Sequence, residues 1–159
     1  MRPITGCPVT LERKPRPSEI GLAAVDSLTV LLVDDDDQVR RFCCNVLAAE
    51  GFRVLEADNG MDALLIAAEC RGAIDVLVTD LIMARISGAA LGRVFQQIWP
   101  SAGVLYISGS CREIVCAELP PESAFLPKPF DGKALVQAVE RRVHARLSAC
   151  AFPSSHGCS

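Results

Sequence analysis

Five residues with chemically reactive side chains each follow a short apolar run of this chain. They are three carboxylates, a hydroxyl and an ammonium: Asp34, Asp35, Asp80, Ser108 and Lys128. Functional groups collect at the carboxyl ends of the strands in an open parallel α/β sheet. We therefore expect these side chains to converge on one rim of such a sheet.

Three carboxylates on one rim would repel one another unless a cation neutralised them. An all-oxygen ligand set suits Mg2+, for which Mn2+ can substitute. Asp80 could then attack a phosphoryl donor, while the metal and Lys128 neutralise the phosphoryl oxygens and Ser108 donates to one of them. The chemistry that these residue types predict is the formation of an aspartyl phosphate.

The segments between these residues alternate between two periodicities. Short apolar runs predict strands at 29–33, 53–56, 75–79, 103–107 and 124–126. Apolar residues at helical spacing predict the buried faces of three helices, namely Val39, Phe42, Val46 and Leu47; Met61, Leu64, Leu65 and Ala68; and Leu91, Val94, Phe95 and Ile98. This alternation is typical of repeated βα units around a parallel sheet.

Capping residues mark the helix ends. Asn59, Ser87 and Asp131 stand where N-caps belong, and Gly51 stands where the first helix should end. A short fourth helix is expected at 111–119 before two prolines, and a final helix at 132–147. We expect one domain at 27–147, between a flexible N-terminal arm at 1–26 and a flexible C-terminal tail at 148–159.

The charge and the apolar content of the chain bear on whether it contacts nucleic acid or a membrane, and on where in the cell it is expected. A formal net charge of -3 lacks the basic excess that contact with a nucleic-acid backbone requires, so no direct nucleic-acid partner is expected. The apolar runs fall far short of the roughly 20 residues that span a bilayer, and the N-terminal segment has no apolar core of a secretory signal. We expect no membrane association and a cytoplasmic location.

Four motifs, taken in order, are together similar to one known family. LLVDDDD holds the acidic pair, VTDLIMARISG the third aspartate, YISG the serine and FLPKPF the lysine, with spacings of 45, 28 and 20 residues counted from Asp35. From Leu28 to Val143 the chain resembles the receiver domains of two-component response regulators, in single-domain form. The resemblance implies a flavodoxin-like, doubly wound parallel sheet of five strands in the order 2-1-3-4-5, with helices on both faces.

The resemblance also implies the phosphoryl donor and the metal ligands. Asp80 would take its phosphoryl group from a phosphohistidine of a histidine kinase or a histidine phosphotransfer protein, with Ser108 and Lys128 assisting. Asp35 would bind the metal directly, Asp34 would bind it through water, and the carbonyl of Ile82 would be a further ligand.

The resemblance further implies how the signal leaves the domain. Lys128-Pro129 would be a cis peptide, and Phe125 would be the aromatic switch residue. The protein would be a signalling phosphoprotein rather than an enzyme, apart from intrinsic self-dephosphorylation. Its output would pass by protein contact to a downstream target, and phosphorylation could also favour a homodimer.

Two departures from the family pattern leave alternatives open. Ala84 replaces a usual proline four residues after the phosphoacceptor, and the segment between the serine and the lysine is short. A degenerate receiver that acts as a phosphorylation-independent interaction module is the main alternative. A phosphatase of the haloacid-dehalogenase type could use a D-x-D motif at Asp34 and Asp36, but Gln38 stands where that family has threonine or valine.

Overall fold

The computed structural model describes residues 27–71, 73–109, 119 and 123–151. Five parallel strands form one sheet in the order β2-β1-β3-β4-β5, as expected. The strands are β1 (Thr29–Val33), β2 (Arg53–Ala57), β3 (Val76–Asp80), β4 (Gly103–Ser108) and β5 (Ala124–Pro127). Branched and aliphatic residues dominate the three central strands, which are buried on both faces, and this is the composition that a covered parallel sheet favours.

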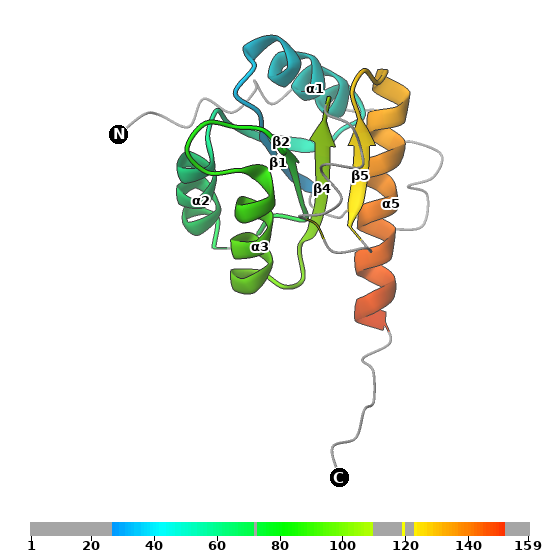
Figure 1. The fold of residues 1–159 in the computed structure, drawn as a ribbon. Helices are drawn as coiled ribbons and strands as arrows, with labels where there is room; N and C mark the ends of the chain where they lie inside the picture. Colours follow the sequence, from blue (N-terminus) through cyan, green and yellow to red (C-terminus); the bar gives the residue numbers. More distant parts are fainter. Residues whose placement is uncertain (1–26, 72, 110–118, 120–122, 152–159) are drawn as a thin grey trace.

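Helices cover both faces of the sheet (Figure 1). The described helices are α1 (Asp37–Ala49), α2 (Gly60–Glu69), α3 (Gly88–Ile98) and α5 (Gly132–Ala151). Helices α1 and α5 pack on one face, and α2 and α3 pack on the other. The doubly wound fold expected from the sequence is therefore confirmed.

Alternate residues of each strand divide the interior into two cores. Val30 and Leu32 of β1 pack with helices α1 and α5, whereas Leu31 and Val33 pack with α2 and α3. This division follows from the two-residue period of a strand, which sends successive side chains to opposite faces. The sheet separates the two cores, and the edge formed by the carboxyl ends of its strands carries the residues of chemical interest.

The expected capping residues all cap helices. The side chains of Asn59 and Ser87 accept hydrogen bonds from backbone N–H groups in the first turns of α2 and α3. Asp131 accepts from the N–H of Ala134 at 2.7 Å, at the start of α5. Gly51 follows α1 with a φ of 90°, a left-handed conformation in which glycine avoids the steric cost of a Cβ atom.

The inner faces predicted for α1, α2 and α3 were each wrong in part. Met61 and Leu65 of α2 are 52% and 60% exposed, while Ala63 and Ala67 are fully buried against the sheet. Helix α2 is apolar almost all the way round, so periodicity could not select its inner face, and the small alanines permit the closer approach. In α1 only Phe42 of the predicted face is wrong, being 42% exposed, whereas Leu47 is buried and Val39 and Val46 pack against the core. In α3, Leu91 and Phe95 are buried as predicted, but Val94 and Ile98 are 38% and 55% exposed.

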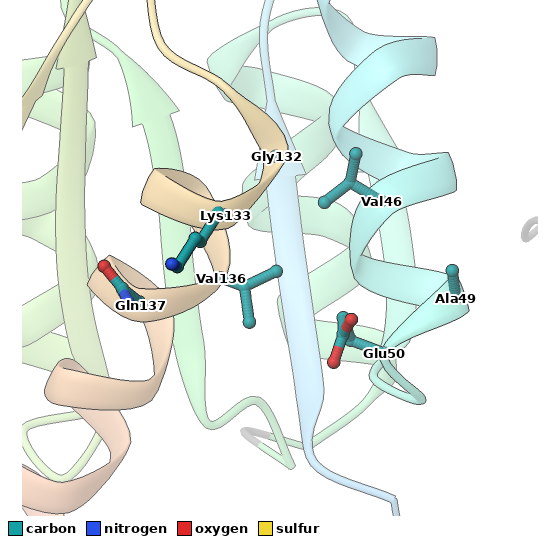
Figure 2. Close-up of a pocket in the computed structure, with 7 residues that line it drawn as sticks. All are labelled: Val46, Ala49, Glu50, Gly132, Lys133, Val136 and Gln137. Atoms are coloured by element: carbon teal, nitrogen blue, oxygen red, sulfur yellow. The ribbon is translucent and has the colours of Figure 1, made fainter. Parts of the chain in front are cut away.

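Helix α5 extends to Ala151, beyond the expected end at residue 147. Its first turn packs closely on α1, since a Cβ added at Gly132 would lie 3.1 Å from a methyl carbon of Val46. Figure 2 shows the residues that line a pocket beside this contact, among them Ala49 of α1, its C-cap Glu50 and Lys133 of α5. The tail expected at 148–159 was therefore wrong over its first four residues, 148–151, which belong to α5. The expected fourth helix except for Leu119, the N-terminal arm and the rest of the tail lie outside the described residues.

Within the described residues, no helix combines the length and the apolar character that a membrane-crossing segment needs.

Candidate functional site

The end of β1 places two carboxylates at the rim of the sheet. Asp34 is only 2% exposed, and its backbone N–H donates to the carbonyl of Ala57 at the end of β2. Its Oδ1 accepts from the N–H of Asp36 at 2.9 Å, and Asp36 in turn caps α1. Asp35 lies between them with its side chain exposed. The loop therefore buries one carboxylate and leaves the next facing solvent.

The end of β3 supplies the third carboxylate. Asp80 is the last residue of the strand, is 8% exposed, and accepts a long hydrogen bond of 3.4 Å from the N–H of Ile82. Carboxylate oxygens of Asp34, Asp35 and Asp80 all lie within 4.8 Å of one another. Three oxygen donors at this spacing fit a hard divalent cation such as Mg2+.

The end of β5 places the positively charged side chain of Lys128 beside the three carboxylates. The Nζ of Lys128 lies 3.1 Å from Oδ2 of Asp34 and 3.6 Å from Oδ2 of Asp80. The Lys128-Pro129 peptide bond is cis, as the resemblance implied. The backbone N–H of Lys128 donates to the carbonyl of Ser108 at 2.8 Å, which ties the ends of β4 and β5 together.

Burial and charge shape the protonation of this group. Burial raises the pKa of the Asp80 carboxyl above its ordinary 3.8; the charge of Lys128 opposes the rise, and that of Asp34 adds to it. Burial alone would lower the pKa of Lys128, but the hydrogen bond and charge of Asp34, together with Asp80, raise it above 10.5. The Lys128 ammonium is therefore held in its charged form between two carboxylates. The ionised form of Asp80, in contrast, is disfavoured by its burial.

The loop after β3 brings the start of α3 against the backbone of the site. Gly88 donates its N–H to the carbonyl of Leu81, and a Cβ added at Gly88 would lie 1.9 Å from the carbonyl oxygen of Asp80. Within the loop, Arg85 has a φ of 72°, which is unfavourable for a residue with a Cβ atom. Only glycine at position 88 permits α3 to begin this close to Asp80.

The remaining predicted residues lie around the same rim. Ser108 ends β4 and is 1% exposed. Phe125 of β5 is half-buried opposite Tyr106 of β4, on the face covered by α2 and α3. The side chain of Ile82 is 63% exposed, so it is the backbone of this residue that lies close to Asp80.

Two residues near the site were missed by sequence reasoning. Arg40 of α1 contacts the backbone of Asp34, and Gly88 contacts the backbone of Asp80. The glycine in the ISG end of its motif was a visible signal, because a glycine at a helix start often permits close backbone approach. No sequence signal distinguished Arg40 from other arginines on a helix surface, because its contacts with Asp34 and Glu56 form only in the folded chain.

Comparisons with known proteins agree with this geometry. A family model described as "Response regulator receiver domain" matches residues 30–140. The chain is 30% identical over 118 residues to the response regulator receiver protein CpdR of Brucella abortus (strain 2308), covering 73% of this chain and 97% of CpdR. It is 36% identical over 116 residues to the sensor kinase CckA of the same organism, covering 72% of this chain and 12% of the kinase.

The solved structures give the same result. A crystal structure of a response regulator receiver protein from Sinorhizobium medicae WSM419 has a TM-score of 0.70 and 30% sequence identity, covering 76% of this chain and 98% of that one. The match spans 28% of a further relative, the DNA-binding transcriptional regulator NtrC of Azospirillum brasilense, so this chain corresponds to one part of NtrC, as it does of CckA. Its strand order and its acidic rim agree with this match, and the chain belongs to the response regulator receiver domain family.

Proposed function

We propose that Asp80 accepts a phosphoryl group from a phosphohistidine of a histidine kinase or a histidine phosphotransfer protein. The observation that carries the proposal is the arrangement of three carboxylates within 4.8 Å of one another, with Lys128 bound to two of them. A degenerate receiver is not favoured, because the acidic pair, the phosphoacceptor, the serine and the lysine are all present at the rim. Membership of the receiver family also counts against a phosphatase of the haloacid-dehalogenase type.

The transfer is a single displacement at phosphorus. A carboxylate oxygen of Asp80 forms the new O–P bond while the P–N bond to the donor imidazole breaks, and the electron pair stays on the imidazole nitrogen. Lys128 holds its ammonium beside Asp34 and Asp80, where it can contact the incoming phosphoryl oxygens. Ser108 would donate its hydroxyl to another of these oxygens after a small movement.

A divalent cation completes this site in our proposal. Asp35 and Asp80 would hold Mg2+ or Mn2+ directly, with Asp34 acting through water and the carbonyl of Ile82 as a further ligand. The bound cation would neutralise charge on the transferring phosphoryl group. Receivers are signalling proteins rather than classical enzymes, and the one reaction we assign to this chain alone is slow hydrolysis of its own aspartyl phosphate, by attack of water at phosphorus.

The signal would leave by protein contact. Movement of Ser108 toward the phosphoryl group would open space for Phe125 to turn inward, which would alter the surface around β5 and α5. A downstream protein, or a second copy in a phosphorylation-linked homodimer, would bind that surface. We place this function in the cytoplasm and in residues 27–147.

Labelling by a small acyl phosphate tests the proposal. With Mg2+ present, intact-protein mass spectrometry of the wild type should show the mass of one added phosphoryl group, and Asp80→Asn should show none. Asp36→Asn is the matched control, because Asp36 caps α1 beside the site and should be labelled normally. Retained labelling of Asp80→Asn would show that the phosphoacceptor is assigned wrongly.

A further inference from the structure

Arg40 lies in the first turns of α1, but its side chain is only 16% exposed and its guanidinium contacts three other residues. Its Nη1 donates to the backbone carbonyl of Asp34 at 2.9 Å, just after β1. Its Nη2 pairs with Asp37 at the start of α1, and its Nε lies 3.5 Å from a carboxylate oxygen of Glu56 on β2. A planar guanidinium held at three positions is a rigid support.

The carbonyl that Arg40 holds belongs to the peptide between Asp34 and Asp35. Fixing the plane of that peptide fixes the positions of the N and Cα atoms of Asp35, and so the point from which its side chain leaves the backbone. Asp35 itself is exposed, so packing restrains it little. Asp34, in contrast, is buried and bound to Lys128, so it has other restraints.

The positive charge of Arg40 and its role as a support should have opposite effects on the affinity of the site for a divalent cation. A positive charge near three carboxylates repels a divalent cation, so removing it should strengthen cation binding if charge alone matters. A support that orients a ligand should weaken cation binding when it is removed, because the ligand must then be ordered during binding. The two effects differ in sign and can be separated by experiment.

We propose that Arg40 is a positioning residue for the divalent cation site, and that it holds the Asp34 carbonyl so that the Asp35 carboxylate faces the cation. This role rests on the proposed function, since it presumes that Asp34, Asp35 and Asp80 bind Mg2+. Arg40 touches neither the phosphoryl group nor the cation and acts through Asp35. Its ion pairs with Asp37 and Glu56 keep the guanidinium in place.

The test is a calorimetric titration of the full 159-residue chain with Mg2+, without a phosphoryl donor. Arg40→Met removes both the charge and the support, whereas Arg40→Lys keeps the charge and loses the planar fork. Arg41→Met is the matched control, because Arg41 is the next residue of the same helix and is exposed. Amide NMR spectra of the cation-free proteins report the position of Asp35 directly.

We expect both Arg40 variants to bind Mg2+ about tenfold more weakly, the magnitude typical of groups that orient a metal ligand. The Asp35 amide signal should shift in Arg40→Lys even without the cation, and Arg41→Met should bind Mg2+ within about twofold of the wild type. Unchanged binding in Arg40→Lys, or tighter binding in Arg40→Met, would overturn the positioning role while leaving the cation site intact. A wild type that binds no Mg2+ would overturn the proposed function and this role with it.

If Arg40→Met does not fold, Arg40→Lys decides the question, because lysine keeps a positive charge beside Asp37 and Glu56. A change in unfolding temperature alone, with unchanged Mg2+ affinity and an unmoved Asp35 signal, would mean that Arg40 only stabilises the fold and would refute the proposal.

Discussion

Among the charged groups of the site, the Asp80 carboxylate has a raised pKa, because burial disfavours its ionised form. Its carboxyl is buried beside a second buried carboxylate, Asp34, and the single ammonium of Lys128 is shared between them. A group placed for reaction often carries such a cost, because burial that suits the reacting state disfavours the resting charge. Without a cation, the folded protein should therefore be less stable with Asp80 ionised than with a neutral residue there.

We predict that Asp80→Asn raises the free energy of unfolding of the cation-free protein by about 1 kcal/mol near neutral pH. Asparagine retains an acceptor for the N–H of Ile82 and leaves Lys128 paired with Asp34. Urea unfolding in the presence of a chelator measures the change. Added Mg2+ should stabilise the wild type and reduce the difference, and a destabilised Asp80→Asn protein would contradict the prediction.

The pH dependence of this difference has a definite sign. Because the folded pKa of Asp80 is raised above 3.8, its contribution to stability is fully present below that pH and is lost as the pH rises through the folded pKa. The advantage of Asp80→Asn should therefore grow as the pH rises through this range. The raised pKa of Lys128 acts at the other extreme, since its stabilising contribution is lost only as the pH rises beyond 10.5.

The position at which α3 begins depends on a glycine. Gly88 and Gly132 are the first residues of α3 and α5, and a Cβ would meet different surroundings at each. At Gly88 the Cβ would lie 1.9 Å from the backbone oxygen of Asp80, which cannot yield. At Gly132 it would lie 3.1 Å from a side-chain methyl of Val46, which can move by a few tenths of an ångström.

We therefore predict that Gly88→Ala destabilises the protein by about 3 kcal/mol, as overpacking against fixed backbone does. Gly132→Ala, the matched control, should change stability by less than about 1 kcal/mol, because gained helix propensity offsets the tight contact. Denaturant unfolding of the two variants checks the pair. Equal effects would mean that α3 can shift away from Asp80 at little cost.

Sequence patterns could predict the strands better than the orientation of the helices. The apolar runs before Asp34 and Asp80 are bounded by charged residues, so their positions as strands were clear. The inner face of α2 was not, because alanines and large aliphatic residues alternate around that helix and only packing chooses between them. At the site, residue types indicated the acidic group and Lys128, but the contact of Arg40 with the Asp34 backbone arises from the folded loop.

In the function that we propose, the phosphoryl group on Asp80 would act on a surface some distance away, around β5 and α5. We predict that a beryllium fluoride mimic with Mg2+ shifts the amide signals of Phe125 and of α5 between Val136 and Val143, as well as those around Asp80. Such coupling is typically worth about 1 to 3 kcal/mol, so a minor population of the altered state should be visible before the mimic is added. NMR spectra and sedimentation velocity with and without the mimic make the comparison. Changes confined to the neighbours of Asp80 would favour a static interaction module.

The division of the interior by the sheet has a consequence for the growing chain on the ribosome. The buried residues of the face under α2 and α3 are all in place once Tyr106 has been synthesised, whereas the face under α1 and α5 needs Leu135, Val139 and Val143. Lys128 also follows all three carboxylates in the order of synthesis. A nascent chain therefore contains all three carboxylates of the acidic rim before Lys128 has been synthesised. We expect divalent cations in solution to ease the assembly of the part of the domain up to Tyr106 until α5 closes the fold.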